Sequence, residues 1–321
     1  MTKFSLIFSL IIWQMTNAKP IRCSFCKESI NNQFVIVNKT KYHKDCYKNH
    51  IQPKCNICDK NIVGIYNIEN GKKYHEQCYD NFLLPKCDIC IKPIKKTYII
   101  DKWNNKYHKS HTYKLPNRDS CTRIICKNIT QGGIKVDSER GVCNLCKPFL
   151  VNKKKLVHNF ARQVKSELRE VGIKKLPKNI PIKLVQSRKE LKKLSKMKHL
   201  NLSGYTKYKY ETLNGQIIKK DYKIYILSNL HQTEFKSVLA HEFLHVYLFE
   251  NNYQLSPEIR EGFCNLGSEL IYKNDDSKYS KLKLDAMNSN PDPVYGLGFK
   301  KMSKLLEQNG WDILLRRLAK L

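Results

Sequence analysis

The sequence predicts an α+β protein in two parts, a series of small β-hairpin units and then a domain that combines a small sheet with helices. Cysteine and histidine recur at a fixed period in the first half, which is typical of a repeated structural unit. Cysteine then almost disappears, and helical periodicity begins near residue 151. The predicted division is a leader at residues 1–18, a repeat region at 19–150 and a second domain at 151–321.

The chain of 321 residues is strongly basic, with 59 Lys and Arg against 28 Asp and Glu and a formal charge of +31. Because 49 of the basic residues are lysines, we attribute the excess mainly to lysine-rich composition, with acidic proteins as the partners that it suits. No recognition-helix pattern accompanies the charge, so nucleic acid is not an expected partner. The only apolar run near membrane length is at the N-terminus, which excludes a protein with several membrane spans.

The first 18 residues have the pattern of a secretory signal peptide. Lys3 gives a positive start, Phe4–Trp13 is apolar, and Thr16-Asn17-Ala18 resembles a small-residue cleavage site. An apolar run of this length is short for a bilayer span, so we expect no membrane span once the leader is removed. An uncleaved anchor or a buried helix is the alternative.

Four units with metal-ligand spacing follow the leader. Each has two nearby cysteines, a gap of 16 or 17 residues, and a second ligand pair. A tight knuckle lets two thiolates face one ion, and a second pair on a following hairpin or short helix completes a tetrahedron. Disulfides would not explain why histidine recurs at the third position, so we predict four structural zinc ions. The four sets are Cys23, Cys26, His43 and Cys46; Cys55, Cys58, His75 and Cys78; Cys87, Cys90, His108 and His111; and Cys121, Cys126, Cys143 and Cys146.

A lysine-rich region of this size buries little apolar surface, so metal binding should supply its folding energy. Runs such as Phe34–Val37 and Thr97–Ile100 fit short hairpins between the ligands. Paired zinc units of this type resemble LIM domains, although eight residues rather than about two separate Cys46 from Cys55. The resemblance implies protein–protein contact or the positioning of a neighbouring domain. His50 is an alternative ligand in the first unit, and a surface position is its simpler interpretation.

Apolar spacing after residue 151 predicts helices around a small sheet. Lys155–Val171 places its apolar residues near one helical face. Ile182–Val185 is a predicted strand, and Tyr205–Tyr210 with Ile217–Leu227 is a predicted hairpin. The apolar segment Phe235–Phe249 is a predicted buried helix.

That predicted helix contains His241-Glu242-Phe243-Leu244-His245, the pattern H-E-x-x-H. Residues four apart share one helical face, so both imidazoles can bind one zinc ion, with Glu242 beside it to take a proton from bound water. This arrangement is typical of zinc metallopeptidases.

A third ligand is expected from the helix that Ser256 caps and Pro257 begins. Glu258 lies in the first turn of this helix, where the helix dipole already explains a carboxylate. Glu261 lies one turn further on. We favour Glu261 and keep Glu258 as the alternative.

These segments resemble the DA-one-type zinc peptidases, plant organ-size regulators that join a LIM-like region to a glutamate-ligand zincin domain. The resemblance implies an endopeptidase with His241, His245 and Glu261 as ligands and Glu242 as base. Cleavage in that family is coupled to ubiquitin, so ubiquitin or ubiquitinated proteins are implied partners, although the plant members' ubiquitin-interacting helices have no counterpart here. The matching segments are Tyr42–Tyr47, Pro53-Lys54-Cys55, Pro181–Gln186, Leu239–Glu242, Leu255–Glu258, Glu261-Gly262 and Pro293–Phe299.

Several features near the predicted site have two interpretations. Tyr295 is a candidate donor to the oxyanion or a packing tyrosine. Asn265 is a candidate to orient a metal ligand or a helix-surface residue. Lys223–Leu227 is a candidate strand for pairing an extended substrate or an ordinary core strand. Cys264, the one cysteine outside the four units, is expected to be a small buried hydrophobe.

We therefore expect a secreted zinc metallopeptidase, a hydrolase of protein substrates with one catalytic and four structural zinc ions. The LIM-like region would recruit the substrate or a partner. A non-catalytic zinc adaptor with a relic peptidase fold and a basic nucleic-acid-binding protein are the alternatives. Secretion usually implies disulfides, whereas zinc ligands must be reduced, so we expect action in a reducing compartment of another cell.

Overall fold

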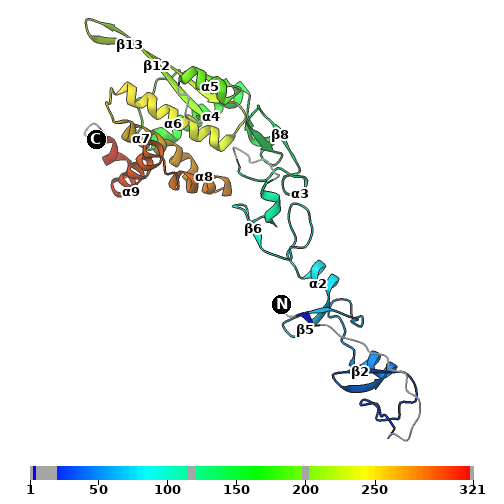
Figure 1. The fold of residues 1–321 in the computed structure, drawn as a ribbon. Helices are drawn as coiled ribbons and strands as arrows, with labels where there is room; N and C mark the ends of the chain where they lie inside the picture. The colour runs from blue at the N-terminus through cyan, green and yellow to red at the C-terminus, as the bar shows by residue number, and fades with distance from the viewer. Residues whose placement is uncertain (1–2, 5–19, 114–120, 197–201, 319–321) are drawn as a thin grey trace. The chain divides into compact units, whose positions relative to one another are not determined.

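The computed structural model describes residues 3–4, 20–113, 121–196 and 202–318 (Figure 1). Most of the predicted signal peptide lies outside these ranges. Its one described element is β1 (Lys3–Phe4), whose backbone pairs antiparallel with Tyr66 and Asn67. Within the described ranges no helix is long and apolar enough to cross a membrane.

The chain divides into two compact units. The first comprises Met1–Ile100 and Asn104–Thr112, and the second comprises Asp101–Trp103 and Tyr113–Leu321. The predicted domain boundary at residue 150 therefore lies inside the second unit, and the fourth cysteine set belongs to that unit. Both units mix helices with small sheets, as the predicted α+β class requires.

The first unit repeats one motif, a two-stranded hairpin that ends at a histidine and is followed by a short helix. Both runs expected to form hairpin strands do so: Phe34–Val37 is a strand as predicted, and the run predicted at Thr97–Ile100 begins one residue later, at Tyr98. The elements are β2 (Phe34–Val37), β3 (Thr40–His43), α1 (Lys44–Cys46) and η1 (Tyr47–Ile51); β4 (Tyr66–Glu69), β5 (Lys72–His75) and α2 (Glu76–Phe82); and β6 (Tyr98–Ile100), β7 (Lys106–His108) and η2 (Lys109–Tyr113).

The second unit begins with another hairpin set and continues into a larger domain. Its first elements are α3 (Lys127–Thr130), β8 (Gly133–Lys135), β9 (Gly141–Cys143), η3 (Lys147–Phe149) and β10 (Leu150–Val151). The domain then comprises α4 (Lys154–Glu170), β11 (Ile182–Val185), α5 (Arg188–Ser195), β12 (Gly204–Leu213), β13 (Gln216–Leu227), β14 (Leu230–His231), α6 (Gln232–Glu250), α7 (Pro257–Lys273), α8 (Lys278–Asn288), η4 (Pro293–Leu297) and α9 (Gly298–Arg317). The predicted helices and strands, from α4 to the start of α7, occur in the predicted order, and β10, α5, β14, α8, η4 and α9 are additional.

The main sheet has the strand order β11-β13-β12, with β11 parallel and β12 antiparallel to the central β13. Helix α6 covers the face of β12 that carries Gly204, Thr206 and Tyr208, because a Cβ at Gly204 would meet Val238 of α6 and Tyr208 stacks on Phe249. Apolar residues surround α6 on most sides, so most of the helix is buried. The sheet and α6 together form the core that positions the H-E-x-x-H ligands.

Helix α7 packs closely on α6. It begins as predicted: Ser256 Oγ accepts a hydrogen bond from the Ile259 amide at 3.4 Å, and Pro257 is the first helical residue. A glycine at position 267 permits the contact, because a Cβ there would lie 3.0 Å from the Ala240 backbone. The first turns of α7 are thereby held beside the ligand face of α6.

A buried arginine joins the fourth hairpin set to the main sheet. Arg140 donates to the carbonyls of Ser228 at 3.1 Å and Gln186 at 3.3 Å, and its Nε pairs with Asp137 at 2.6 Å. Ser228 and Gln186 directly follow β13 and β11. Strand β10 also pairs with β14, which leads into α6. The fourth hairpin set is thus built onto the segment that starts the ligand-bearing helix.

We expect Arg140→Ala to destabilise the second unit by about 3–5 kcal/mol, because it removes the cation paired with Oδ2 of Asp137 and the side-chain donor to the carbonyls of Ser228 and Gln186. The matched control is Arg162→Ala, since Arg162 is exposed on α4 and donates a hydrogen bond to Asn159 at 2.8 Å. Thermal and urea unfolding of the two proteins measure the difference. Equal unfolding midpoints would contradict a structural role for the buried guanidinium.

Candidate metal centres

Five groups of side chains in the described ranges place their ligand atoms within 4.8 Å of one another, as an ion requires, and all are compatible with zinc. Three lie in the first unit and two in the second. The groups are Cys23, Cys26, His43 and Cys46; Cys55, Cys58, His75 and Cys78; Cys87, Cys90, His108 and His111; Cys121, Cys143 and Cys146; and His241, His245 and Glu261.

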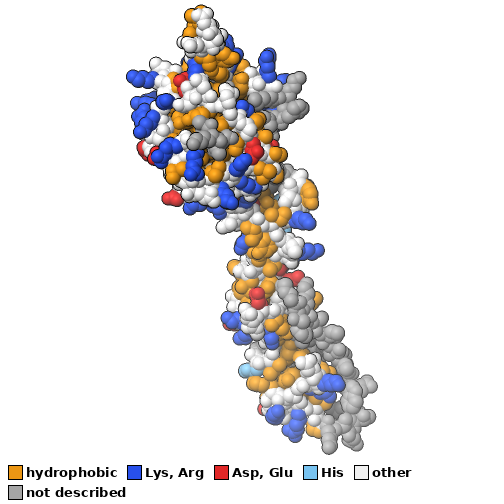
Figure 2. All heavy atoms as spheres, turned by 90° about the vertical axis from the view of Figure 1, so that its left-hand side faces the viewer, with side chains coloured by type: hydrophobic (Ala, Val, Ile, Leu, Met, Phe, Trp, Pro, Cys, Tyr) orange, Lys and Arg blue, Asp and Glu red, His pale blue; other side chains and the backbone are white. Residues whose placement is uncertain are grey.

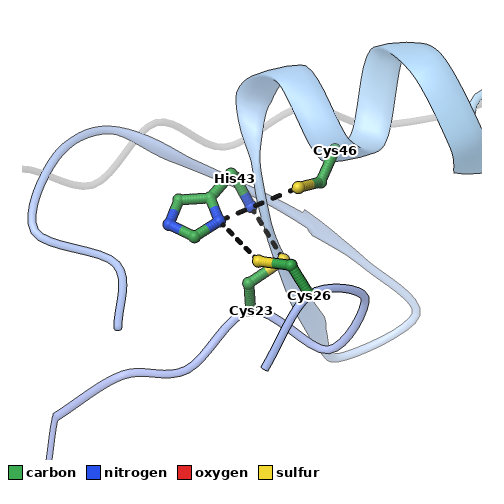
Figure 3. A group of neighbouring side chains, drawn as sticks. All are labelled: Cys23, Cys26, His43 and Cys46. Atoms are coloured by element: carbon green, nitrogen blue, oxygen red, sulfur yellow. Dashed lines mark hydrogen bonds between the residues drawn. The ribbon is translucent and has the colours of Figure 1, made fainter. Parts of the chain in front are cut away.

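The first group shows how the repeat builds a centre (Figure 3). Cys23 and Cys26 come from a tight turn, His43 ends β3 and Cys46 ends α1. The Nδ1 atom of His43 lies 3.3 Å from the sulfur of Cys26 and 3.9 Å from that of Cys46. Ordinary zinc bond lengths place tetrahedral nitrogen and sulfur ligands about 3.6 Å apart. The side chains therefore converge at a spacing that suits zinc in a LIM-like manner.

A hydrogen bond to the backbone orients the histidine in each of the first three groups. In all three the Nε2 atom lies 3.2 Å from a carbonyl oxygen, which places the ring proton on Nε2 and leaves Nδ1 free to bind metal. The pairs are His43 with Ser29, His75 with Asn61 and His108 with Pro93. Ligand spacing in the sequence did not indicate which nitrogen binds.

The thiols of the first group have opposed pKa shifts that a cation would relieve. Burial alone would raise the pKa of Cys23, but hydrogen bonds from backbone amides lower it to about 6. Burial and the neighbouring sulfurs of Cys26 and Cys23 raise the pKa of Cys46 to about 11. Several thiolates so close together repel one another, and a divalent ion neutralises them. The group thus has the charge balance of a metal site.

The fourth group contains three of its four predicted ligands. Cys121 and Cys143 have their sulfurs 3.4 Å apart, and Cys146 completes the buried group. Cys126 lies outside it, contrary to the prediction. Its sulfur instead accepts a hydrogen bond from the Ile129 amide, because Cys126 is the residue that caps the start of α3.

The alternative ligand in the first unit, His50, lies outside the metal group. Its ring stacks on Phe25 with the centroids 4.3 Å apart. Cys46 takes the fourth ligand position instead. His50 is therefore a suitable control residue, because it lies close to the first metal group but is not one of its ligands.

The fifth group joins α6 to α7. His241 and His245 have their Nε2 atoms 3.1 Å apart, and each lies 3.4 Å from Oε2 of Glu261. Zinc–nitrogen and zinc–oxygen bonds of ordinary length give tetrahedral edges of about 3.3 Å. Glu258 is partly exposed and pairs with Lys301 at 3.5 Å. The structure therefore brings Glu261, and not Glu258, to the two histidines.

Electrostatics keep the carboxylate of this group ionised. Burial would raise the pKa of Glu261, but the hydrogen bonds and charges of His241 and His245 outweigh it and hold the pKa well below its usual range. Burial opposes the charged form of His241 in turn, and Glu261 with Glu242 raises its pKa. Two imidazoles and one carboxylate are a ligand set of known catalytic zinc sites.

Each histidine of the fifth group also has a partner for its other nitrogen. Nδ1 of His241 lies 2.9 Å from Oδ1 of Asn265, whose Nδ2 donates to the Tyr295 carbonyl at 3.1 Å. Nδ1 of His245 lies 3.4 Å from the sulfur of the buried Cys264. Asn265 therefore fixes the orientation of the His241 ring, which is the first of its two interpretations from the sequence. The sequence did not reveal the contact between Cys264 and His245.

We expect Asn265→Ala to weaken metal binding at the fifth group by about 10- to 100-fold, the usual effect of losing a partner of a metal-bound imidazole. Asn265→Asp keeps the acceptor and should retain affinity. Asn309→Ala in α9 is the remote control. The measurement is the amount of zinc that the protein retains at increasing concentrations of a chelator. Comparison with His241→Ala, which removes a ligand of this group, identifies the ion that belongs to it. Unchanged retention in Asn265→Ala would contradict the orienting role.

A buried glutamate lies beside the fifth group. Glu242 is 4% exposed, and its Oε2 accepts a hydrogen bond of 2.6 Å from the Thr206 hydroxyl of β12. Gly204 of β12 leaves room for the carboxylate, because a Cβ there would lie 2.5 Å from Glu242 Oε1. Strand β12 thus borders the site. The spacing of residues in the sequence predicts neither the contact of Thr206 nor that of Gly204 with Glu242.

The strand proposed for pairing a substrate is not available. Lys223–Leu227 lies in β13, which pairs with β11 on one side and β12 on the other. Its backbone donors and acceptors therefore face other strands, so the core-strand interpretation is correct. The edge of the described sheet beside Glu242 is β12.

Tyr295 lies in η4, near the carboxylates of the site. Burial, together with the negative charges of Glu261 and Glu242, raises its pKa well above the usual range. The phenol consequently remains protonated at neutral pH and is able to donate a hydrogen bond.

Comparison with known proteins adds no family to these observations. No family model matches the chain, and no curated protein matches it. An inference about function therefore depends on the residues and geometry of the five groups.

Proposed function

We propose that the protein is a zinc-dependent endopeptidase of protein substrates. The observation that carries the proposal is the fifth group, in which His241, His245 and Glu261 converge while the buried Glu242 is held beside them. Three protein ligands leave a position for water or substrate, as in catalytic zinc sites. The resemblance of the surrounding segments to the DA-one-type zinc peptidases, with their zincin domain, supports the same assignment.

The residues around this group have distinct roles in the proposed hydrolysis. Bound zinc would lower the pKa of its water to about 7 and polarise the scissile carbonyl. Glu242 accepts the proton of the attacking water and transfers it to the leaving amine. The Thr206 hydroxyl holds Oε2 and so fixes the carboxylate, which leaves Oε1 for the proton. Tyr295 donates to the oxyanion.

The LIM-like units are proposed to recruit a substrate or partner. This role applies to the three groups of the first unit, because the fourth is built into the second unit through Arg140 and β10. By resemblance, ubiquitin or ubiquitinated proteins are candidate partners. All thirteen cysteines are unpaired thiols in the structure, as a reducing compartment requires. Secretion before action in such a compartment of another cell is proposed from the leader pattern alone.

The test is proteomic identification of new protein termini. A reduced cell extract is incubated with the wild-type protein or with Glu242→Gln, each loaded with zinc. We expect termini that only the wild type generates and that a chelator suppresses. A non-catalytic adaptor predicts the same termini in both samples, and that result would reject the peptidase.

A further inference from the structure

The hairpin of β12 and β13 is much longer than the rest of its sheet. Its strands have 10 and 12 residues, whereas β11 has 4 and pairs only with the last residues of β13. Asn214 and Gly215 form the turn with φ of 50° and 77°, as a tight two-residue hairpin requires. Figure 1 shows this hairpin extending beyond the helices of its unit. We call residues 207–220 the arm.

The arm begins at the candidate active site. Gly204 and Thr206, just before it on β12, lie against Glu242. The opposite edge of β12 pairs with no other strand in the described part of the chain. A free edge of ten residues offers about 33 Å of backbone donors and acceptors. Such an edge can add an extended peptide as a further strand.

The arm is anchored to α6 by stacked aromatic rings and one lysine. Tyr208 stacks on Phe249 with centroids 4.5 Å apart, and on Tyr210 and Tyr222 at 5.4 and 5.5 Å. Nζ of Lys220 donates to the Phe249 carbonyl at 2.7 Å. These contacts hold the base of the hairpin in place.

The outer part of the arm exposes apolar side chains. Leu213 and Ile218 are each 60% exposed, and Tyr210 and Ile217 are also exposed. Figure 2 shows hydrophobic side chains on the projection at the top of the molecule, where this hairpin ends. A two-stranded hairpin gains no core from such residues, so exposed apolar side chains this close to its tip indicate a contact surface.

The charges of the arm define the chemistry of its partner. Lys219 pairs with Glu211 at 2.9 Å and with Asp221 at 3.5 Å, so the acidic side chains of the hairpin are already engaged. Lys207 and Lys209 are exposed and have no ion-pair partner among the described residues. The charges left for a partner are positive, beside apolar side chains.

We propose that the arm binds an extended segment of the protein substrate that carries acidic residues next to apolar ones. This inference rests on the proposed peptidase function. The segment adds to the free edge of β12, and its side chains contact Lys207, Lys209 and the apolar tip. Because β12 continues to Glu242, the docked chain leads into the active site. The substrate class is therefore unfolded or locally extended protein, since a compact fold does not offer a strand of this length.

The first test measures binding without cleavage. The full-length Glu242→Gln protein is titrated with fluorescein-labelled β-casein, an unfolded acidic protein, in reducing buffer with zinc. We expect Lys207→Glu/Lys209→Glu and Leu213→Ser/Ile218→Ser each to raise Kd at least fivefold. The charge-reversal effect should shrink in 1 M salt, whereas the apolar effect should persist. Lys174→Glu/Lys175→Glu, in an exposed loop after α4, is the control. Arm variants equal to the control would overturn the proposal.

The second test uses the same substitutions with Glu242 intact. KM for β-casein should rise by the same factor, while kcat and the cleavage of a short quenched peptide stay unchanged. If neither the wild type nor any variant cleaves β-casein while binding still depends on the arm, the proposed peptidase function is wrong and the proposed role of the arm in binding is retained. If cleavage occurs with equal KM in all variants, the arm proposal fails alone. If the arm variants lost binding to phosphatidylserine vesicles but bound β-casein as the wild type does, the arm would be a membrane-binding element, and that result would overturn the proposal.

Discussion

Glu242→Gln should lower kcat/KM for peptide hydrolysis by at least about 10²–10⁴-fold, the usual contribution of a general acid–base group. An amide cannot accept the proton of the attacking water, so hydrolysis loses its base. Glutamine has the size of glutamate and can still accept a hydrogen bond from Thr206, so the buried pocket stays filled. We therefore expect the fold and the bound metal to be unchanged.

The measurement combines turnover of a protein substrate with zinc content by elemental analysis. Glu258→Gln is the matched control, because this carboxylate lies on α7 near the site but pairs with Lys301. It should retain activity. Full activity in Glu242→Gln would refute the mechanism, and loss of an ion from that variant would mean that the carboxylate acts as a ligand.

Cys46→Ala should unfold the first zinc unit and remove one ion. Structural zinc in small domains contributes an apparent binding energy of about 10–16 kcal/mol at neutral pH. Beyond the ligand Cys23, this unit buries only Ile30 and Tyr47 among the hydrophobic residues described around its centre. Such a small core cannot replace the metal. The hairpin of β2 and β3 should therefore become accessible to proteases.

The control for this substitution is His50→Ala, four residues along the chain. His50 stacks on Phe25 but lies outside the metal group, so its removal should leave the zinc content intact. Elemental analysis and limited proteolysis of residues 20–52 compare the two proteins. A folded Cys46→Ala protein that keeps its full zinc content would contradict a structural metal centre in this unit.

Local patterns predicted much of the fold. The cap of α7 at Ser256 and Pro257 was predictable because it involves neighbours in the chain. The ligand pairs of the first three groups follow from their spacing in the same way. Cys126 shows the limit of spacing, because its sulfur caps the start of α3 and does not join the other three cysteines.

The order of strands in the sheet was not predictable. Lys223–Leu227 has the residue types of an ordinary strand, and only its pairing with both β11 and β12 shows it to be central. The edge at β12, and with it the docking arm, depends on which segments lie side by side. Such contacts join residues far apart in the sequence, so no local pattern records them.

The sequence by itself determined the ligand types, their period and the placement of His241 and His245 on one helical face, because helix geometry fixes positions four residues apart. The sequence favoured Glu261 but left Glu258 open, and only the tertiary structure decided between them. The tertiary structure alone set Thr206 and Gly204 against Glu242 and joined the fourth cysteine group to the second unit. Both glutamates lie near the start of the same helix. Which one reaches the histidines depends on how α7 packs on α6, a contact set by the whole core.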